Sequence, residues 1–497
     1  MVDVDVAIVG AGPTGLSLAL LLARAGRSVI VFERHEVPYP LPRAVHYDGE
    51  AARILQACGL GKQLPQLSEP ADTYEWRNGQ GQVLLRFGIA GASRSGWPAS
   101  SMFNQPDLEQ ALRRQVDARQ LIDLRVGAEV TGFDQDDDQV VVQTADGSSV
   151  AASFVVGCDG ANSAVREALD LELEDHGFFF DWLVVDVHLR DDRTFVPINL
   201  QICDPVRPTT AVSGGPGRRR WEFMCLPGEE LDALDNEAAA WELLEPWGVH
   251  PGNAELVRHA GYRFKACWAR RWHKGRVAIA GDAAHQTPPF AGQGMCAGLR
   301  DAANLAWRLD LALGERSHEA LLAGYDAERI PQATAVIEFA IELGKVICIP
   351  DSAAAAARDE LMVAGAEGPP METPPMPGLT SGLLFDSPGS GQLGLQATVG
   401  VLGDVGLLDD LVGLGWRLLC HHTSAGLDVE LVHHFAQLGG AVVDLGPDGD
   451  VADLDGSYGR WFAELGTSSV LQRPDGYVFG SADDPNMLLC SLFDQLG

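Results

Sequence analysis

The sequence predicts a mixed α/β protein with three parts: a nucleotide-binding domain of alternating strands and helices, an antiparallel sheet inserted into that domain, and a separate C-terminal domain. The first 33 residues read as a strand, a glycine turn, a helix and a second strand. The middle of the chain alternates β-forming residues, and a proline-rich stretch precedes residue 378. A chain of 497 residues is long enough to bury several cores.

The amino-terminal unit is the most local of these patterns. The apolar run 4–9 predicts a buried strand, a helix follows as far as Arg24, and residues 28–32 predict a second strand. A strand, a crossover helix and a second strand of this length form a βαβ unit with parallel strands. We therefore expect a Rossmann-like start to the chain.

The turn between the first strand and its helix carries a glycine fingerprint. Its glycines are Gly10, Gly12 and Gly15, and an acid follows at Glu33. In this setting the first glycine permits the tight turn, the second lets a pyrophosphate approach the backbone, and the third allows close helix packing. Glu33 would bind ribose hydroxyls, and the alternative is a glycine-rich turn without a ligand. The neighbouring residues taken as cofactor-binding are Pro13, Thr14 and Arg34.

Later segments give the domain boundaries. Turn residues at 214–217 interrupt β-rich stretches, and prolines cluster between residues 369 and 377. We expect the nucleotide-binding domain at 1–176 and 265–350, the inserted antiparallel sheet at 177–264, a linker at 351–377 and the C-terminal domain at 378–497.

Composition excludes several classes of function. Acids outnumber bases 69 to 36, for a net charge of -33, which argues against a nucleic-acid partner and favours a solubilising acidic surface. Nine cysteines without C-x-x-C or metal-ligand spacing predict free thiols in a reducing cytoplasm and no metal. We find neither a secretion signal nor an apolar run that would span a membrane.

Two further motifs specify the cofactor. They are the segments 155–166, with Asp159-Gly160 and Arg166, and 281–294, with Gly281-Asp282, Pro288-Pro289 and Gly292-Gln293-Gly294. Both resemble motifs of the flavoprotein aromatic hydroxylases, the class typified by para-hydroxybenzoate hydroxylase, and they follow the glycine fingerprint in that family's order. Segments 218–223 and 294–307 resemble the subgroup that contains 3-(3-hydroxyphenyl)propionate hydroxylase.

The resemblance implies bound FAD and a set of contacts. Asp282 would accept hydrogen bonds from the ribityl chain, although a helix cap is an alternative role. The backbone at Gly292, Gln293 and Gly294 would approach the flavin ring. The resemblance also assigns Asp159 and Gly160 to FAD and to the transient nicotinamide, and Arg43 and Gln105 to the pyrophosphate region. For Arg166 a structural ion pair is an equal alternative.

The nicotinamide and the C-terminal domain are less defined. A second glycine fingerprint is absent, as in a family that binds nicotinamide only briefly, and NADH and NADPH stay equally open. Residues 378–497 resemble the thioredoxin-like C-terminal domain of larger family members. With only Cys420 and Cys490 this domain lacks the pair needed for disulfide exchange, so we expect a structural or subunit-contact role, for example in a homodimer.

Four residues are candidate catalytic groups, each with a structural alternative. Arg220 could steady the flavin or an anionic substrate, or be a charge on an exposed strand face. His46 could act as an acid or base, or be a capping or surface histidine. Tyr262 could turn its hydroxyl into the substrate pocket, or lie in a core. Pro289 lies beside the flavin ring in the family, and a rigid turn is its alternative.

The family chemistry implies the function. FAD is reduced by NADH or NADPH, O₂ is captured as a flavin C4a-hydroperoxide, and a phenolic ring takes the distal oxygen. We therefore predict a cytoplasmic FAD-dependent monooxygenase that hydroxylates a small aromatic substrate. A polyketide-tailoring or Baeyer-Villiger flavin oxygenase is the alternative enzyme, because the same motifs serve both. A non-catalytic flavin-binding sensor or scaffold is the alternative of another class.

Overall fold

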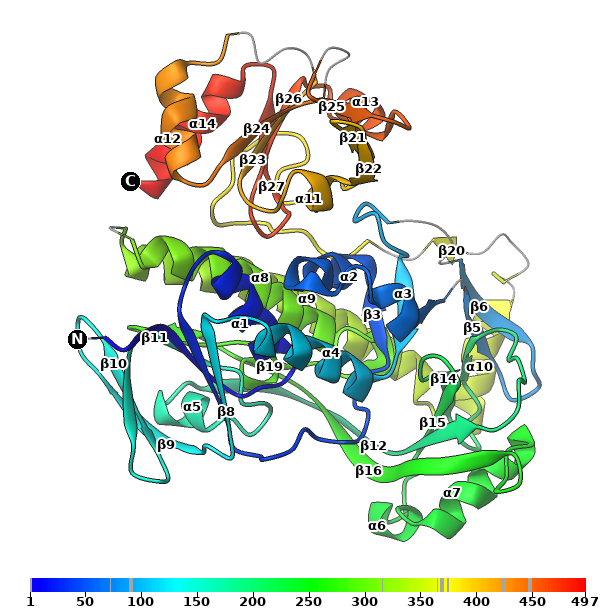
Figure 1. Cartoon of the computed structure of the whole chain (residues 1–497). Coiled ribbons are helices and arrows are strands. Elements are labelled where there is room, and N and C mark those ends of the chain that lie inside the picture. The colour runs from blue at the N-terminus through cyan, green and yellow to red at the C-terminus, as the bar shows by residue number, and fades with distance from the viewer. Residues whose placement is uncertain are drawn as a thin grey trace.

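The computed structural model describes residues 2–71, 73–88, 93–314, 316–363, 365–366, 371–372, 375–421, 426–445 and 449–497. Figure 1 shows a main body with the C-terminal domain above it and the inserted sheet at its lower right. The opening unit has the predicted elements, β1 (Val4–Val9), α1 (Pro13–Arg24) and β2 (Val29–Glu33), with β1 and β2 parallel.

The first sheet contains this opening unit at its centre. Its order is β17-β18-β11-β1-β2-β8, with β10 on β11 and β9 on β10. The central strands are apolar along their length because helices cover the parallel part of the sheet, and Val6, Ala7 and Ile8 are fully buried. The other strands are β8 (Ile122–Val126), β9 (Val130–Gln135), β10 (Val140–Thr144), β11 (Ser149–Gly157), β17 (His273–Lys274) and β18 (Val277–Ile279).

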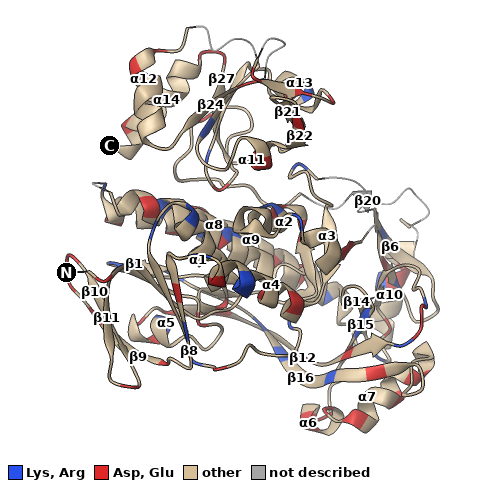
Figure 2. Ribbon diagram, viewed as in Figure 1, with Lys and Arg blue, Asp and Glu red and all other residues tan. Residues whose placement is uncertain are grey.

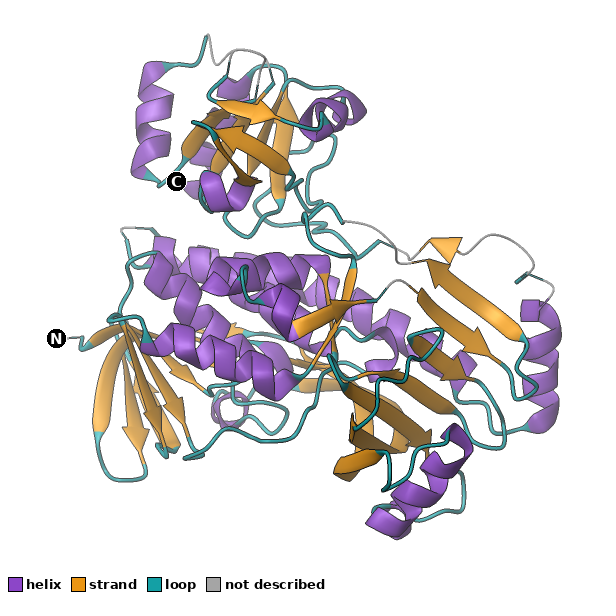
Figure 3. Ribbon diagram, turned by 45° about the vertical axis from the view of Figure 1, so that its right-hand side comes forward, coloured by secondary structure: helices purple, strands orange, loops and turns teal. Residues whose placement is uncertain are grey.

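Helices pack on this sheet and on one another. Helix α1 packs between α4 (Gln105–Asp117) and α8 (Gly294–Ala312), and α9 (His318–Ile347) packs along α8. Figure 3 shows these helices between the strands of the first sheet and those of the inserted sheet. The shorter helices are α2 (Gly49–Leu55), α3 (Leu64–Leu67) and α5 (Ala164–Ala168).

The inserted sheet is antiparallel in its centre, as expected, but it takes strands from outside 177–264. Its order is β19-β16-β12-β15-β14-β13-β5-β6-β20. Strands β5 and β6 come from residues 73–88, well before the expected insertion, and they complete one side of the inserted sheet. The parallel β5–β13 pairing joins residues more than 120 positions apart, which a local pattern does not reveal. The strands are β5 (Thr73–Arg77), β6 (Val83–Gly88), β12 (Leu173–Leu189), β13 (Asn199–Ile202), β14 (Thr209–Ser213), β15 (Arg218–Met224), β16 (Ala254–Ala269), β19 (His285–Gln286) and β20 (Met371–Glu372).

The segment expected to be a linker contains a packed helix. Within 351–377 the structure has α10 (Ser352–Val363), in which Arg358 is buried and donates to the backbone oxygens of Val346 and Cys203. The helix begins with a run of alanines, and alanine has the highest helix propensity of all residues. We gave more weight to the prolines that follow, and the linker prediction was therefore wrong for this part of the segment. On the outer face of the inserted sheet lie α6 (Leu231–Leu234) and α7 (Glu237–Leu244).

The C-terminal domain has the thioredoxin-like arrangement that the sequence predicts. Its main sheet has the order β24-β23-β26-β27, in which β23 and β24 are parallel and the other pairs are antiparallel. The strands of this domain are β21 (Thr398–Val401), β22 (Asp404–Leu407), β23 (Arg417–Cys420), β24 (Ala441–Asp444), β25 (Val451–Asp453), β26 (Ser469–Gln472) and β27 (Val478–Ala482). The helices are α11 (Leu408–Leu411), α12 (Val429–Gln437), α13 (Ser457–Leu465) and α14 (Pro485–Leu496).

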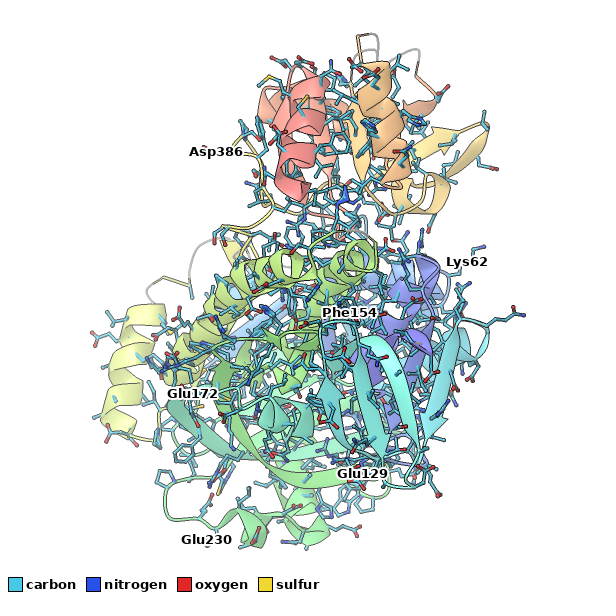
Figure 4. All side chains as sticks on the ribbon, turned by 90° about the vertical axis from the view of Figure 1, so that its left-hand side faces the viewer. Lys62, Glu129, Phe154, Glu172, Glu230 and Asp386 are labelled. Atoms are coloured by element: carbon cyan, nitrogen blue, oxygen red, sulfur yellow. The ribbon has the colours of Figure 1, made fainter. Side chains whose placement is uncertain are left out.

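The molecule is long, and acidic residues lie along all of it (Figure 2). Figure 4 places Glu230, beside α6, and Asp386, in the C-terminal domain, at opposite ends. Acidic residues are spread over the ribbon in Figure 2, including α6 and α7. In the described part of the chain, no helix combines the length and the apolar character that crossing a bilayer requires.

A small sheet links the helices of the first domain to the inserted sheet. Its strands are β3 (His46–Asp48), β7 (Ser100–Phe103) and β4 (Ser68–Pro70), in the order β3-β7-β4. It carries His46 and leads directly into α2.

Candidate cofactor and active site

The glycine loop between β1 and α1 is shaped by contacts at two of its glycines and open at the third. Gly10 has a φ of +107°, and a Cβ there would lie 2.4 Å from the backbone oxygen of Cys158. A Cβ at Gly15 would lie 2.1 Å from the oxygen of Gly10. A Cβ at Gly12 would meet nothing within 4 Å, which leaves the amino end of α1 open to a ligand.

The residues around this loop support its shape. Glu33, at the end of β2, accepts hydrogen bonds from the backbone N–H groups of Ala11 (2.9 Å) and His35 (3.0 Å). Thr14 fills the space beside Gly281 and Gly298, since a Cβ at either position would lie within 3 Å of its hydroxyl oxygen. Pro13 occupies the first turn of α1, where its missing N–H costs no hydrogen bond. Arg34 is exposed, and within the described part of the chain its one side-chain hydrogen bond is to the His35 ring, at 3.2 Å.

Gln105 holds the loop that carries Arg43. The buried Gln105 amide oxygen accepts from the backbone N–H groups of Arg43 (3.2 Å) and Ala44 (2.6 Å), and its amide nitrogen donates to Glu109 at 2.6 Å. Arg43 is half exposed and lies 3.7 Å from a Glu109 oxygen. Burial raises the pKa of Glu109. The Arg43 guanidinium therefore lies at the surface of the site, with its backbone fixed.

Arg220 is buried, which removes the exposed-strand alternative. Its guanidinium binds both Asp186 oxygens, at 2.7 and 2.9 Å, and donates to the backbone oxygens of Pro42 (2.8 Å) and Arg43 (2.6 Å). Arg258, on the next strand but one, also donates to Pro42. Arg220 thus fastens the Arg43 loop to the inserted sheet, and it acts through that loop instead of reaching a substrate itself.

The Asp159-Gly160 segment is tied to the Gly281-Asp282 segment. Asp159 accepts from the Ser163 hydroxyl (2.5 Å) and from the backbone N–H of Val165 (3.2 Å). The buried Arg166 donates to the oxygens of Ala283 (2.9 Å) and Ala161 (3.1 Å), so it is a structural arginine that joins the two segments. A Cβ at Gly160 would meet nothing within 4 Å.

Asp282 and Tyr262 face the Arg43 side of the site. Asp282 is exposed to solvent, yet many protein atoms surround it, and this desolvation raises the pKa of its carboxyl. Tyr262 is 45% exposed on β16 and packs 5.2 Å from the ring of Phe264, so it is not a core tyrosine. Desolvation and the nearby Asp282 carboxylate raise the pKa of its hydroxyl.

The segment 288–294 forms a tight turn against both the small sheet and the inserted sheet. Pro289–Ala291 is one turn of 3₁₀ helix, and Gly292 follows with a φ of +64°. Phe290 packs against Trp182 and Phe264 of the inserted sheet, with ring centroids 6.0 Å apart in each case. A Cβ at Gly294, the first residue of α8, would meet nothing within 4 Å, so a second helix start is open.

His46 fixes this turn, and both of its ring nitrogens are engaged. Nδ1 lies 3.0 Å from the Gly292 oxygen and Nε2 lies 3.0 Å from the Ser100 hydroxyl. Burial lowers the pKa of the imidazole. With both nitrogens engaged, His46 is not a free surface histidine, and it holds the Gly292 turn against the small sheet. Its role as an acid or base stays a prediction.

Three residues near this turn were missed by the sequence analysis. Arg300 donates to the Gln293 side chain at 3.0 Å and pairs with Asp48 (2.5 Å) and Glu50 (2.7 Å). Asp48 also caps α2. These acids lie about 250 positions from Arg300, so a single sequence carries no signal for the cluster beyond the arginine in the 294–307 segment. Desolvation by burial alone would lower the pKa of the Arg300 guanidinium, but attraction to Asp48 and Glu50 outweighs it, so the pKa is raised.

Two open helix starts, a parallel sheet that leads into them and an acid at the end of β2 are the features of a dinucleotide-binding protein. The residues fit a large dinucleotide such as FAD, because Gly12, Gly160 and Gly294 leave open space beside bare backbone.

The comparisons identify the class more closely. Residues 3–340 match the family model described as FAD binding domain, and residues 391–492 match the HcaD C-terminal domain. Together with the named relatives described next, this match shows that the chain belongs to the FAD-dependent aromatic hydroxylases and is a flavoprotein monooxygenase, as the sequence predicts.

Named relatives agree with this family. The chain is 39% identical over 496 residues to a probable NADH-specific resorcinol 4-hydroxylase of Rhodococcus jostii, covering 97% of this chain and 92% of the relative. It is 31% identical to the 3-(3-hydroxy-phenyl)propionate/3-hydroxycinnamic acid hydroxylase of Escherichia coli, covering 97% and 92%. The fold matches aklavinone-11 hydroxylase in complex with FAD and aklavinone, with a TM-score of 0.81, 24% identity and coverage of 100% and 99%.

Proposed function

We propose that this FAD-dependent aromatic hydroxylase uses NADH and hydroxylates a dihydric phenol of the resorcinol type. The observation that carries the proposal is the 39% identity, over almost the whole of both chains, to a probable NADH-specific resorcinol 4-hydroxylase. The phenylpropionate hydroxylases are less similar, at 30 to 31% identity.

One buried cation at this junction is the reason that a phenylpropionate belongs in the test. Arg220 and Arg258 both donate to the backbone oxygen of Pro42, and Arg220 is also neutralised by Asp186. Among the described residues Arg258 has no carboxylate in an ion pair, and its Nε has no hydrogen-bond partner. A buried carboxylate needs such a cation, because an unpaired buried charge is costly, whereas a neutral dihydric phenol does not.

In this proposal each predicted site residue has a positional role. The open helix starts at Gly12 and Gly294 offer N–H groups to the pyrophosphate and to the flavin ring, and Asp282 accepts from the ribityl chain. FAD, once reduced by the nicotinamide, supplies the oxygen chemistry. Phe290, Trp182 and Phe264 keep water from one side of the Pro288-Pro289 turn, where the substrate ring would lie. Tyr262 and Arg43 face the open side.

The test is steady-state oxidation of NADH and NADPH by FAD-loaded protein, with products followed by mass. The panel contains resorcinol, phenol, 3-(3-hydroxyphenyl)propionate and a polycyclic phenol. We expect resorcinol to stimulate NADH oxidation and to gain one oxygen atom. Stimulation by the phenylpropionate alone, or by the polycyclic phenol alone, would assign the chain to those substrates instead.

Two expectations about the environment are part of the same proposal. The described cysteines are free, most are buried, and burial raises the pKa of thiols such as Cys58 to about 12, which suits a reducing cytoplasm. We also propose a homodimer. Light scattering after size-exclusion chromatography checks this, and a mass near 53.1 kDa would contradict it.

A further inference from the structure

The loop between β26 and β27 enters the flavin domain from the C-terminal domain. In Figure 1 this hairpin points from the upper domain toward α2 and α8. The loop is anchored by charge: Arg473 donates to Glu328 of α9 at 2.9 and 2.6 Å, and Asp475 accepts from Asn304 and Trp307 of α8 at 3.0 Å each. These hydrogen bonds and ion pairs fix the position of Tyr477, at the end of the loop, between α2 and α9.

From Tyr477 a continuous series of hydrogen bonds leads to the Gly292 turn. The Tyr477 hydroxyl donates to one Glu50 oxygen at 2.7 Å and accepts from Gln332 at 2.8 Å. The other Glu50 oxygen accepts from Arg300 at 2.7 Å. Arg300 then donates to the Gln293 side chain at 3.0 Å. Each of these side chains belongs to a residue that is at least nine-tenths buried.

We propose that Tyr477 is a positioning residue by which the C-terminal domain sets the flavin-facing segment 292–294. The hydroxyl holds one carboxylate oxygen of Glu50, which leaves the other to orient the Arg300 guanidinium toward Gln293. Without the hydroxyl, one buried oxygen loses its donor, and the carboxylate gains by rotating toward Arg300. That rotation would turn the guanidinium away from Gln293. The proposal rests on the FAD assignment but not on the identity of the phenol.

The test compares Tyr477→Phe with Tyr458→Phe. Tyr458 is a fully buried tyrosine of the same domain, and among the residues that the structure describes its hydroxyl bonds to the backbone of Ala397 and Leu395 alone. Three readouts are taken: hydrogen exchange of residues 290–299 in the apoprotein, the FAD dissociation constant, and hydroxylated product per NADH oxidised. The first two do not need an active enzyme.

We expect Tyr477→Phe to raise exchange in 290–299 and the FAD dissociation constant by about fivefold each, the size of one lost buried hydrogen bond. Product per NADH should fall, with hydrogen peroxide making up the difference. Tyr458→Phe should leave each of the three readouts within about twofold of the wild-type value, because this variant changes only the stability of the C-terminal domain. Equal effects of the two variants, or none from Tyr477→Phe, would overturn the proposal.

A double-mutant cycle covers the case in which Tyr477→Phe alters the loop in general. In a Glu50→Gln background, the removal of the Tyr477 hydroxyl should no longer change exchange in 290–299, because the path through Glu50 is already broken. Additive effects would mean that Tyr477 acts by another route, and the proposal would be wrong. If the loaded wild-type protein hydroxylates none of the phenols, the proposed function fails while exchange and FAD binding still decide this point.

Discussion

Two buried arginines fasten the loops that carry Arg43 and Gln293, and they do so differently. Arg220 forms hydrogen bonds with one carboxylate, Asp186, and lies 3.7 Å from a second, Glu222. It also donates to the backbone oxygens of Pro42 and Arg43. Arg300 binds two carboxylates, Asp48 and Glu50, and reaches its loop through the side chain of Gln293. The first arginine holds backbone directly, whereas the second holds it through side chains that have partners of their own.

The difference predicts which loop is adjustable. A backbone oxygen fixed by a guanidinium has few alternatives, so the Arg43 loop should be set by the inserted sheet together with Gln105 of α4, and not by the C-terminal domain. The Gln293 loop depends on Glu50, and thus on groups as distant in the chain as Tyr477. Removing either arginine leaves buried carboxylates uncompensated, and the number of carboxylates should set the order of the effects.

The largest effect is expected from Arg300→Met. This change leaves two carboxylates, of Asp48 and Glu50, buried near one another without a cation. We expect a loss of about 5 kcal/mol in the free energy of unfolding, the upper end for a broken buried pair. Urea denaturation of the apoprotein measures it. A loss smaller than that of the next variant would contradict the reasoning from carboxylate number.

Arg220→Met should cost less, about 3 kcal/mol, because only Asp186 loses a hydrogen-bonded cation, while Glu222, 3.7 Å from Arg220, keeps Arg258 nearby. It should also weaken FAD binding, since the Arg43 loop loses two backbone hydrogen bonds. Arg263→Met is the matched control: its pair with Asp181 has the same 2.7 Å geometry, but the arginine is exposed. Unchanged denaturation is expected for the control, and an equal loss in both variants would refute a role for burial.

Gly12→Ala separates cofactor affinity from stability. The methyl group would enter open space at a backbone conformation that alanine accepts, with φ at -78°. Apoprotein stability should therefore be retained while the FAD dissociation constant rises about tenfold, because the methyl occupies the approach to the pyrophosphate. Gly15→Ala should do the reverse and lower the melting temperature of the apoprotein, since its methyl meets the Gly10 oxygen. Fluorescence titration with FAD and thermal melts distinguish them.

The smallest effect concerns pH. Burial lowers the pKa of His46 in the folded state below its ordinary value of 6.5, so the unfolded chain binds a proton more readily than the folded chain does. The contribution of His46 to stability is thus present above about pH 6.5 and is lost as pH falls below it. His46→Gln should flatten the stability profile between pH 5.5 and 7.5. Parallel profiles for both proteins would show that another group titrates.

The sequence predicts well those features that rest on neighbouring residues. The β1–α1–β2 unit, its three glycines and the order of the later motifs are local patterns, and the family resemblance that they carry is confirmed by the match of residues 3–340. The alanines of α10 are also a local pattern that predicts a helix, but the nearby prolines led to the prediction of a linker instead.

The sequence does not predict contacts between distant segments. Arg220 could be placed on a strand, but its partners Asp186 and Pro42 come from other elements. Glu50 and Tyr477 are 427 positions apart, and neither stands in a motif, so their bond has no signature in a single chain. Burial itself decides the roles of such polar residues, and burial follows only from the assembled fold.

The place of Tyr477 in the chain also has a consequence for biosynthesis. Tyr477 is synthesised 427 residues after Glu50, so the bond between them can form only when the chain has been made as far as the β26–β27 loop. The glycine loop of β1 and α1 lies far upstream of that point. A nascent chain can therefore form the glycine loop early, but the hydrogen-bond series from Tyr477 to Gln293 has to wait for the C-terminal domain.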